Sequence, residues 1–585
     1  MSASHRRRSL ALRARFPLRY SRREFLRRSA LAGAAALSLP ALTACGNSRS
    51  GGAAAAPVSG RTVAFLHGVA SGDPLTDRVI LWTRVTPEAG SLAPVAVDWV
   101  VSLAPDLSAP VASGRVLTDG ERDFTVKIDP AGLASFTTYY YQFSVAAPDG
   151  SAQRSPIGRT RTAPAASDAV SQIRIAAAAC NNYTFGLFNA FGRIGERADL
   201  DLVLHLGDYL YEGGNGQGDL RAHTPDREIL TLADYRERHA QYKTDPDLQE
   251  AHRQHPWITT WDDHESTNNS FASGADNHTE GEEGCWAERV GWAIRAYFEW
   301  MPIRDRGAPD APDAALCPEA PPATGLRPDG SGRIYRKVAY GEQLDLFVLD
   351  TRLVGRAPIQ GTSLVSPEQT ILGAEQRDWL LRELPASTAT WKLVLSGTTF
   401  APLITPGGNP TTGCTSTPGS EPCYLNEDAW DGYRFDRNAV FDVLEQAQVQ
   451  NTVFVFGDIH AVIACDLPRV PNDPLAYNPL TGEGSLGVEL CCGGVAQVPL
   501  PIWNALRASG SNPHMKHVNE TQLGYQLMDL TAERLQSEWY YSVVQVASTA
   551  ESRDPVMLET LSGSQRLTVA TSASPGKDNP PPLAP

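Results

Sequence analysis

Residues 199–212 read DLDLVLHLGDYLYE and contain the strand around which we expect the rest of the chain to be arranged. The mostly apolar run 203–206 has the length and β-branching of a buried strand, and it ends just before Asp208. Ligands of α/β folds bind beyond the carboxyl ends of parallel strands, so Asp208 is predicted to lie at a binding rim. Asp208 can bridge two cations, and Tyr211 can bind one of them as a phenolate. Taken alone, the stretch fits a strand followed by a solvated turn equally well.

Three further predicted strands end in side chains of the kind that bind metals. These strands and their terminal residues are IRIAAAAC (173–180) with Cys180, HPWITTWDDHE (255–265) with Asp262, Asp263, His264 and Glu265, and NTVFVFGDIH (451–460) with Asp458 and His460. A predicted helix separates the first of them from the run 203–206, so Cys180 and Asp208 are expected on neighbouring parallel strands. The alternative for Cys180 is a small buried hydrophobe. Repetition at four strand ends favours a metal site over a series of solvated turns.

The ligand types at these strand ends favour one class of chemistry. A carboxylate shared between two cations about 3.5–4 Å apart is the geometry of metal-assisted phosphoryl hydrolysis. The chain has no G-x-S-x-G nucleophile elbow and no Gly-rich phosphate-binding loop. We therefore expect the attacking nucleophile to be a metal-bound oxygen.

The length of the chain and its pattern of strands predict two domains. At 585 residues the chain is longer than one hydrophobic core usually supports. Residues 61–164 hold short alternating strands separated by Gly, Pro and Asp turns, which predicts an immunoglobulin-like β-sandwich. Residues 172–546 alternate strands and helices as an α/β layer structure does. Residues 547–585 are predicted to form a C-terminal extension whose tail, from Ser574 onward, is disordered.

Residues 1–45 are predicted to be a targeting segment. Residues 21–27 (SRREFLR) resemble a twin-arginine export signal, and an apolar segment too short to span a membrane follows. Cys45 in LTACG resembles the lipidated cysteine of a bacterial lipobox; the alternative is a plain cleavage site. Residues 46–60 are expected to be a flexible tether. We expect the twin-arginine export machinery to deliver the protein to the periplasm or another extracytoplasmic place, with a lipid anchor if Cys45 is modified.

The charge of the chain excludes one class of partner. The formal net charge is −15, and residues 1–45 contain ten Arg and one Glu, which leaves −24 for the remainder. An acidic body argues against nucleic-acid binding and is compatible with several bound cations. No internal apolar run is long enough to span a membrane.

Nine cysteines in an exported protein suggest that some form disulfides. Cys414 and Cys423 flank a Gly/Pro/Ser-rich loop and are the first pair expected, and Cys285 with Cys317 is the second. The adjacent residues 491 and 492 leave their state open.

Several motifs together resemble the alkaline phosphatase D (PhoD-like) family. In chain order they are HGVASGDP with RVILWTR, GDYLYE, YKTDPDLQ, WDDHE, LDTR, EQRDWL and GDIH, between about residues 62 and 545. The resemblance implies a β-sandwich followed by a metallophosphoesterase-like α/β sandwich that carries the catalytic site. It also implies a ferric ion with one or two calcium ions, and broad hydrolysis of small phosphate esters at alkaline pH outside the cytoplasm.

The same resemblance implies ligands for both kinds of ion. The residues implied for iron are Cys180, Asp208, Tyr211 and His460. Asp208 would bridge to calcium, and the further oxygen donors implied for calcium are Asp262, Asp263 and Asp458. Which of the two adjacent aspartates binds directly stays open.

Other residues are implied to act on the substrate or to support the ligands. His264 would bind phosphate or protonate the leaving oxygen. Arg352 would hold a phosphate oxygen, and the alternative for it is a structural salt bridge to Asp350. Glu212 and Asn182 would support ligands from behind. Relatives tend to have Gln after the cysteine, where this chain has Asn, and this departure concerns the supporting groups rather than the metal.

Three functions are compatible with these residues. The first is an exported phosphomonoesterase or phosphodiesterase that recovers inorganic phosphate from organic esters. The second is a phospholipase- or nuclease-like diesterase, which would depend on loops such as residues 401–429. The third is a non-catalytic surface lipoprotein that binds ligands through its β-sandwich, and the four ligand-bearing strand ends argue against it.

Overall fold

The computed structural model describes residues 60–304, 333–359, 364–407 and 423–585. These residues belong to one compact unit that runs from Val58 to Pro585. The predicted export signal, Cys45 and residues 46–59 of the tether lie outside the described residues. Among the helices in the described ranges, none combines the length and the apolar character that a membrane crossing needs.

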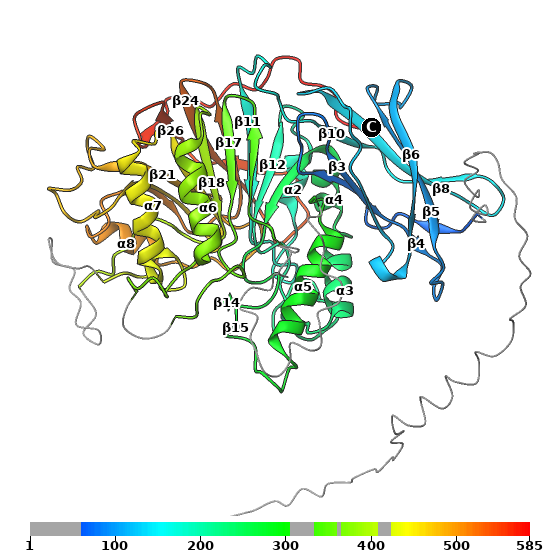
Figure 1. The fold of residues 1–585 in the computed structure, drawn as a ribbon, viewed down its shortest axis with the longest axis horizontal. Helices are drawn as coiled ribbons and strands as arrows, with labels where there is room; N and C mark the ends of the chain where they lie inside the picture. The colour runs from blue at the N-terminus through cyan, green and yellow to red at the C-terminus, as the bar shows by residue number, and fades with distance from the viewer. Residues whose placement is uncertain (1–59, 305–332, 360–363, 408–422) are drawn as a thin grey trace, which may run out of the picture. The chain divides into compact units, whose positions relative to one another are not determined.

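A mixed 11-stranded sheet holds the first group of predicted ligands (Figure 1). In spatial order its strands are β27 (Thr568–Val569), β26 (Leu558–Leu561), β24 (Arg534–Ser542), β23 (Gly524–Leu530), β11 (Ile173–Ala178), β12 (Leu202–Leu206), β13 (Pro256–Thr260), β2 (Val69–Gly72), β3 (Ile80–Arg84) and β7 (Thr125–Ile128), with β25 (Glu551–Arg553) paired to β24. The central strands β11, β12, β13 and β2 are parallel to one another.

A seven-stranded sheet holds the second group of predicted ligands. In spatial order its strands are β16 (Arg336–Tyr340), β17 (Leu344–Val348), β18 (Trp391–Ser396), β19 (Thr452–Phe456), β21 (Ser485–Cys491), β20 (Val462–Pro468) and β22 (Met515–Asn519). Strands β17, β18, β19 and β21 are parallel.

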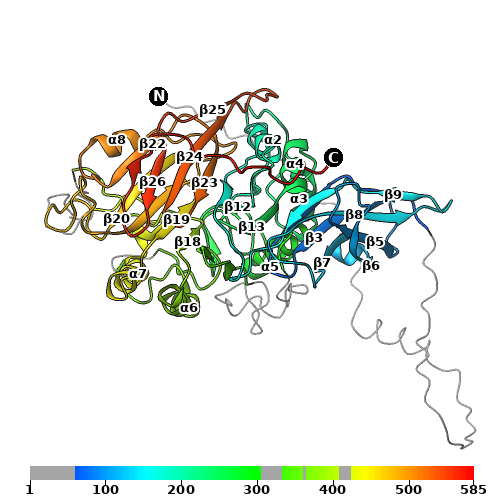
Figure 2. The ribbon, with the colours of Figure 1, turned by 90° about the horizontal axis from the view of Figure 1, so that it is seen from above.

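Helices cover the outer faces of both sheets. Those on the 11-stranded sheet are α2 (Asn189–Gly195), α3 (Leu232–Tyr242), α4 (Pro246–Gln254) and α5 (Trp286–Trp300). Those on the seven-stranded sheet are α6 (Gly373–Ala386), α7 (Arg434–Gln446) and α8 (Trp503–Ala508). Figure 2 shows α6 and α7 together on one flank of the strands.

The alternation along β11 shows how the layers are held together. Ile175 and Ala177 belong to the apolar cluster between the two sheets, which also contains Leu346 of β17. Ala176 and Ala178 belong to the cluster under the helices of the 11-stranded sheet. Because side chains alternate along a strand, both faces of β11 are buried, and its residues are apolar except for Arg174, which is buried and pairs with Asp529. The predicted α/β fold is confirmed.

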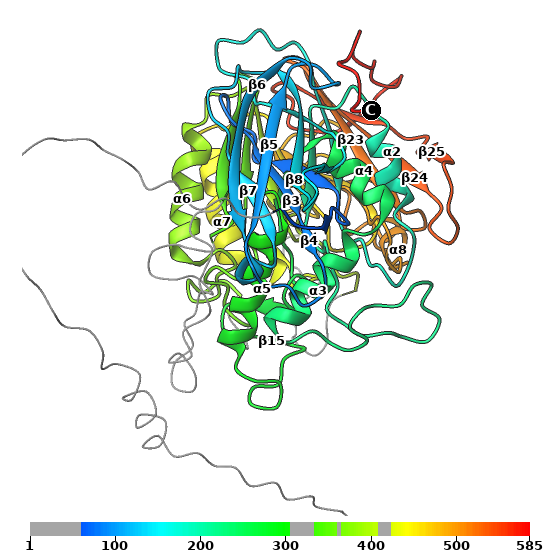
Figure 3. The same ribbon diagram turned by 90° about the vertical axis from the view of Figure 1, so that its right-hand side faces the viewer.

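The segment predicted to be an N-terminal β-sandwich shares strands with the large sheet. Its own five-stranded sheet consists of β10 (Gly158–Arg161), β8 (Thr138–Ala146), β5 (Val95–Ser102), β6 (Pro110–Thr118) and β9 (Ala152–Arg154). Strands β3, β5, β7 and β8 lie close together (Figure 3). Their apolar side chains form one core, which contains Val97 of β5, Phe143 of β8 and Leu81 of β3. Strand β2 pairs in parallel with β13. The expected boundary at residue 164 therefore separates chain segments but not sheets.

The C-terminal segment is ordered, so the predicted disorder of the tail is wrong. Strands β25, β26 and β27 extend the 11-stranded sheet. Beyond them, Arg174 Nη1 donates to the Pro575 carbonyl at 2.6 Å, and Tyr140 Oη donates to the Pro582 carbonyl at 2.6 Å. The backbone N–H of Ala584 donates to Gln254 Oε1 at 2.8 Å. Composition predicts disorder where little apolar surface can be buried, and it misses carbonyl groups that accept hydrogen bonds from side chains elsewhere.

The described cysteines separate into two groups. Cys285 and Cys423 are each disulfide-bonded. Their expected partners, at positions 317 and 414, lie outside the described residues. Cys491 and Cys492 are free and buried, which settles the state that the sequence left open.

Candidate metal centre

The predicted ligands follow parallel strands of two facing sheets. Cys180 lies beyond β11, Asp208 beyond β12 and residues 262–265 beyond β13. Because β11 and β12 are neighbours with parallel register, the predicted placement of Cys180 and Asp208 is confirmed. Asp458 and His460 lie beyond β19 of the other sheet.

The backbone at these strand ends is unusual. Four of the predicted ligands have left-handed dihedrals: Cys180 (φ 56°), Asp208 (φ 56°), Asp458 (φ 68°) and His460 (φ 52°). Residues other than glycine rarely adopt this conformation, and such residues gather at functional sites. Gly207 has φ 107°, and a Cβ there would lie 2.5 Å from Asp262 Cβ. Glycine is therefore required where the loops after β12 and β13 meet.

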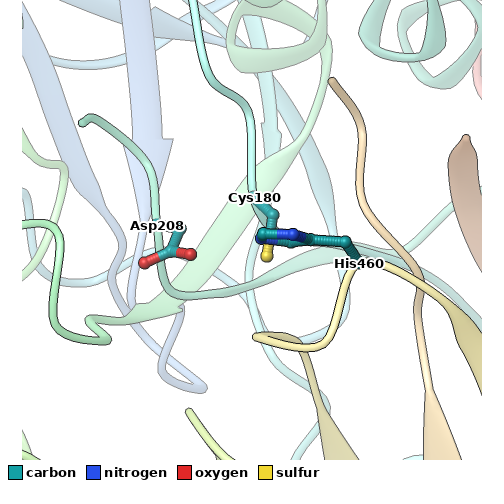
Figure 4. A group of neighbouring side chains, drawn as sticks. All are labelled: Cys180, Asp208 and His460. Atoms are coloured by element: carbon teal, nitrogen blue, oxygen red, sulfur yellow. The ribbon is translucent and has the colours of Figure 1, made fainter. Parts of the chain in front are cut away.

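Asp208 is shared by two groups of ligand atoms. One atom from each of Cys180, Asp208 and His460 lies within 4.8 Å of the other two (Figure 4). The same limit holds for Asp208, Asp263 and His264. Asp208 is 2% exposed, and its Oδ1 has no hydrogen-bond partner in the described part of the chain. Its Oδ2 accepts a 2.9 Å hydrogen bond from Tyr211 Oη.

The donor set fits two cations of different character. Thiolate, phenolate, carboxylate and imidazole around Cys180 suit a transition-metal ion, whereas carboxylate oxygens suit a hard divalent ion. Burial raises the pKa of Asp208 well above its usual value, His264 opposes this shift, and Asp263 adds to it. A bound cation would favour the ionised form, and the orphaned Oδ1 would become its ligand.

His264 lies against both Glu212 and Tyr211. Its Nδ1 is 2.6 Å from Glu212 Oε2, and its ring is 4.2 Å from the Tyr211 ring, centroid to centroid. Burial alone would lower the pKa of His264, but Glu212 and Asp263 outweigh it and raise the pKa well above the usual value. The side chain is 20% exposed, so the imidazole can meet a ligand from solvent. Glu212 thus lies where the sequence predicted a supporting group.

Arg352 contacts other carboxylates than the one expected. Its Nε and Nη2 donate to the two oxygens of Asp262 at 2.6 and 3.0 Å, and its Nη1 donates to Asp428 at 2.6 Å. The alternative of a salt bridge to Asp350 is wrong. Asp350 instead accepts the backbone N–H groups of residues 352 and 353, because it caps the turn after β17.

Asp262 and Asp458 take no part in the two groups of ligand atoms found in the described residues. Both oxygens of Asp262 bind Arg352. Asp458 Oδ1 lies 3.8 Å from Arg352 Nη2. Of the two adjacent aspartates that the sequence could not separate, the structure brings only Asp263 together with Asp208.

Some residues of the site had no predicted role. Asn181 Nδ2 donates to the Tyr209 carbonyl at 2.8 Å, whereas Asn182 accepts from Thr184 within its own turn. The supporting asparagine is therefore residue 181 and not 182. Its signal was its place directly after Cys180. Asp428 lies in the loop 401–429, which was expected to affect the choice of substrate, but its own role was not predicted, because its contact with Arg352 joins segments 76 residues apart.

The fold and the candidate site together define a class of protein. Two facing mixed sheets, with groups of side chains at their strand ends that could hold metal ions, make the chain an α/β protein with a candidate metal centre. The family model described as "PhoD-like phosphatase" matches residues 175–539, and the model of its N-terminal domain matches residues 52–164. The chain belongs to the PhoD-like phosphatase family, as the sequence motifs predicted.

Alkaline phosphatase D of Bacillus subtilis and one solved structure agree with this assignment. Alkaline phosphatase D of Bacillus subtilis (strain 168) is 34% identical over 421 residues, which cover 69% of this chain and 65% of that protein. The chain therefore matches just under two thirds of that relative's length. The structure titled "Structure of PhoD" superposes with a TM-score of 0.75 and 29% identity, over 89% of this chain and 94% of that one. A purple acid phosphatase from yellow lupin seeds aligns with a TM-score of 0.48 and 13% identity, over 80% and 71% of the two chains.

Proposed function

We propose that the chain is a metal-dependent alkaline phosphatase or phosphodiesterase that releases inorganic phosphate from small phosphate esters. Its family membership and its relative from Bacillus subtilis support the reaction class. The observation that carries the proposal is the position of Asp208. One buried carboxylate contributes to both ligand groups, as a bridge between two cations must.

We assign the two groups to different ions. Cys180, Asp208, Tyr211 and His460 would hold a ferric ion, and Asp208 with Asp263 would hold calcium. Such ions supply positive charge to the phosphoryl oxygens and acidify a water molecule when they are bound. Asp262 and Asp458 were also expected to bind calcium. Asp262 would instead support the centre by holding Arg352, which binds both of its oxygens.

The side chains of the chain itself orient the ester and move a proton. His264 carries its proton opposite Glu212, and its partial exposure lets it bind a phosphate oxygen or protonate the leaving oxygen. Arg352 is completely buried, so it would act on substrate only through the carboxylates that surround it. Monoester and diester substrates would be distinguished by loops such as the one that contains Asp428.

Substitution of Asp208 tests the assignment. Asp208→Asn should abolish hydrolysis of a generic phosphate ester while the circular dichroism spectrum stays unchanged, because one neutral amide cannot bridge two cations. Asp436→Asn is the matched control, since Asp436 is also buried, belongs to neither ligand group and accepts the backbone N–H groups of residues 371 and 372. Full activity in Asp208→Asn would refute the mechanism.

Metal analysis tests the identity of the ions. Iron together with calcium is expected in the purified protein, with a visible charge-transfer band that weakens in Tyr211→Phe. Zinc or manganese without such a band would keep the metal centre and reject the ferric ion.

We further propose export by the twin-arginine route, periplasmic or other extracytoplasmic placement, and lipid attachment at Cys45. The motifs in residues 21–27 and 42–46 support these proposals. Replacing Arg22 and Arg23 by Lys should leave the protein in the cytoplasm, and Cys45→Ser should release it from membranes. The immunoglobulin-like character of residues 61–164 is likewise proposed, and their two packed sheets support it.

A further inference from the structure

The loops after β12 and β13, which carry Asp208 and Asp263, are joined to each other differently from the loops after β11 and β12. Between the ends of β11 and β12, backbone pairing continues beyond the strands: the N–H of Cys180 donates to the Gly207 carbonyl, and the N–H of Asn181 donates to the Asp208 carbonyl. Between β12 and β13 the register ends at Leu206 and its partner. The N–H groups that follow on this side need other acceptors.

Glu265 supplies these acceptors. Its Oε2 accepts the backbone N–H of Asp208 at 3.1 Å and that of Asp262 at 2.9 Å. Its Oε1 accepts the backbone N–H of Tyr209 at 2.7 Å. The side chain is buried, at 4% exposure, so no solvent competes for these bonds. A single carboxylate therefore replaces the backbone pairing of β12 with β13 beyond Leu206 and Thr260.

The other polar groups of Tyr209 are also fixed. Its carbonyl accepts from Asn181 Nδ2, and its hydroxyl lies 2.9 Å from His252 Nε2 and 3.0 Å from Lys243 Nζ. The residue that follows Asp208 is thus fixed at its carbonyl and at its ring, and its N–H depends on Glu265. In the loop after β13, the backbone N–H of Asp262 is bound by the same carboxylate. Glu265 is the element common to both loops.

We propose that Glu265 is a positioning residue that holds the loops after β12 and β13 at the separation at which Asp208 and Asp263 share a cation. The inference rests on the proposed metal-dependent function. Glu265 belongs to neither ligand group, and its hydrogen bonds in the described structure go to backbone N–H groups rather than to ligand side chains. Groups that orient metal ligands typically alter metal affinity about 10–100-fold when they are removed.

Glu265→Gln is the informative variant, because it keeps the size of the side chain but places an amide N–H against backbone donors. Glu489→Gln is its matched control. Glu489 on β21 is 1% exposed and accepts the backbone N–H groups of Phe400 at 2.6 Å and Ala401 at 2.8 Å. Neither of these two residues is a predicted ligand or adjacent to one in the sequence. Both variants lose the same kind of buried hydrogen bond, and only one of them loses the link between ligand loops.

The first measurement is the iron and calcium content of the full chain after equilibration with increasing chelator. Glu265→Gln should release metal at a chelator concentration about 10–100-fold lower than the wild type, whereas Glu489→Gln should match the wild type. Release by Glu265→Gln within threefold of the wild type would overturn the proposal. Equal release by both variants would overturn it too, because general destabilisation would then explain the effect.

Hydrogen exchange in the metal-free protein provides a test that needs neither activity nor metal. In the wild type, the backbone N–H groups of Asp208, Tyr209 and Asp262 should exchange slowly, and in Glu265→Gln at least about tenfold faster. If Glu265→Gln does not fold, the wild type alone decides, since rapid exchange of these three groups would contradict the proposal. A wild type that shows slow exchange but binds no metal would refute the proposed function and leave the link between the loops intact.

Discussion

Arg352 is a fully buried cation surrounded by carboxylates from several segments of the chain. It pairs directly with Asp262 and Asp428, and Asp263 and Asp458 lie 3.8 Å from its Nη2. Positive charge at this point offsets the repulsion among acids that lie beside the ligand groups. The guanidinium is thus a structural counter-ion of the centre.

Removal of this charge should be costly. Arg352→Met should lower the free energy of unfolding of the metal-free protein by about 3–5 kcal/mol, because it leaves buried Asp262 without a partner. Urea unfolding in the presence of chelator measures the loss. Arg437→Met is the control, because Arg437 forms a buried pair with Asp431 on another segment. The control should lose a similar free energy of unfolding and keep the wild-type KM for a phosphate ester. A loss of unfolding free energy below about 1 kcal/mol in Arg352→Met would contradict the argument.

Much of the site at this scale is predictable from the sequence. Cys180, Asp208 and His460 could be grouped because strand ends of α/β layers meet at one edge. The partners of Arg352 could not, since the sequence marks residues 401–429 as a loop relevant to the substrate but does not show that Asp428 within it contacts Arg352. Glu265 was visible in the acidic run after β13, but its role depends on where the neighbouring backbone ladder ends.

The helices and strands, like the site residues, could be predicted from the sequence only in part. Helix α3 begins at Leu232, where the sequence itself indicates a start, because Thr231 and Asp234 form a capping box. The sequence reading missed α4, although Asp245 caps it and Pro246 occupies its first turn. Its polar composition concealed that signal. The apolar strands were recognised from their length and composition, whereas their order in the sheets depends on long-range pairing.

The turn after β12 yields a prediction at the scale of the element. Gly207→Ala combines a strained φ with a Cβ 2.5 Å from Asp262 Cβ, and should cost about 2–6 kcal/mol of unfolding free energy and lower metal content. Gly218→Ala is the control: its φ is 95°, and a Cβ would meet nothing within 4 Å. Only the strain, about 1–3 kcal/mol, applies there. Equal losses in chemical denaturation would show that the close approach to Asp262 is unimportant.

For the whole molecule, a buried lysine links the N-terminal segment to the metal loops. Lys243 Nζ lies over the Trp82 ring of β3, 4.8 Å from its centroid, and donates to Tyr209 Oη. The groups around it are His252, at 3.2 Å, and the rings of His205 and His239, and none of these carries negative charge. Burial lowers the pKa of Lys243 to about 7.

This lysine should make stability rise with pH. Between about pH 7 and 10.4 the unfolded chain binds a proton at Lys243 that the folded chain does not, so unfolding becomes less favourable as pH increases. The gain should be on the order of 3–5 kcal/mol across that range. Lys243→Met should lack it, which denaturation of both proteins at pH 7 and pH 10 would reveal. Parallel changes in the two proteins would contradict the prediction.

The parallel pairing of β2 with β13 has a practical consequence for anyone who trims this protein. A catalytic fragment that starts after residue 164 would lose β2, and the backbone groups of β13 on that side would become a free edge. Such an edge can template the addition of strands from other molecules. A minimal fragment that keeps β13 covered must therefore retain β2, even though β2 lies in the other family domain.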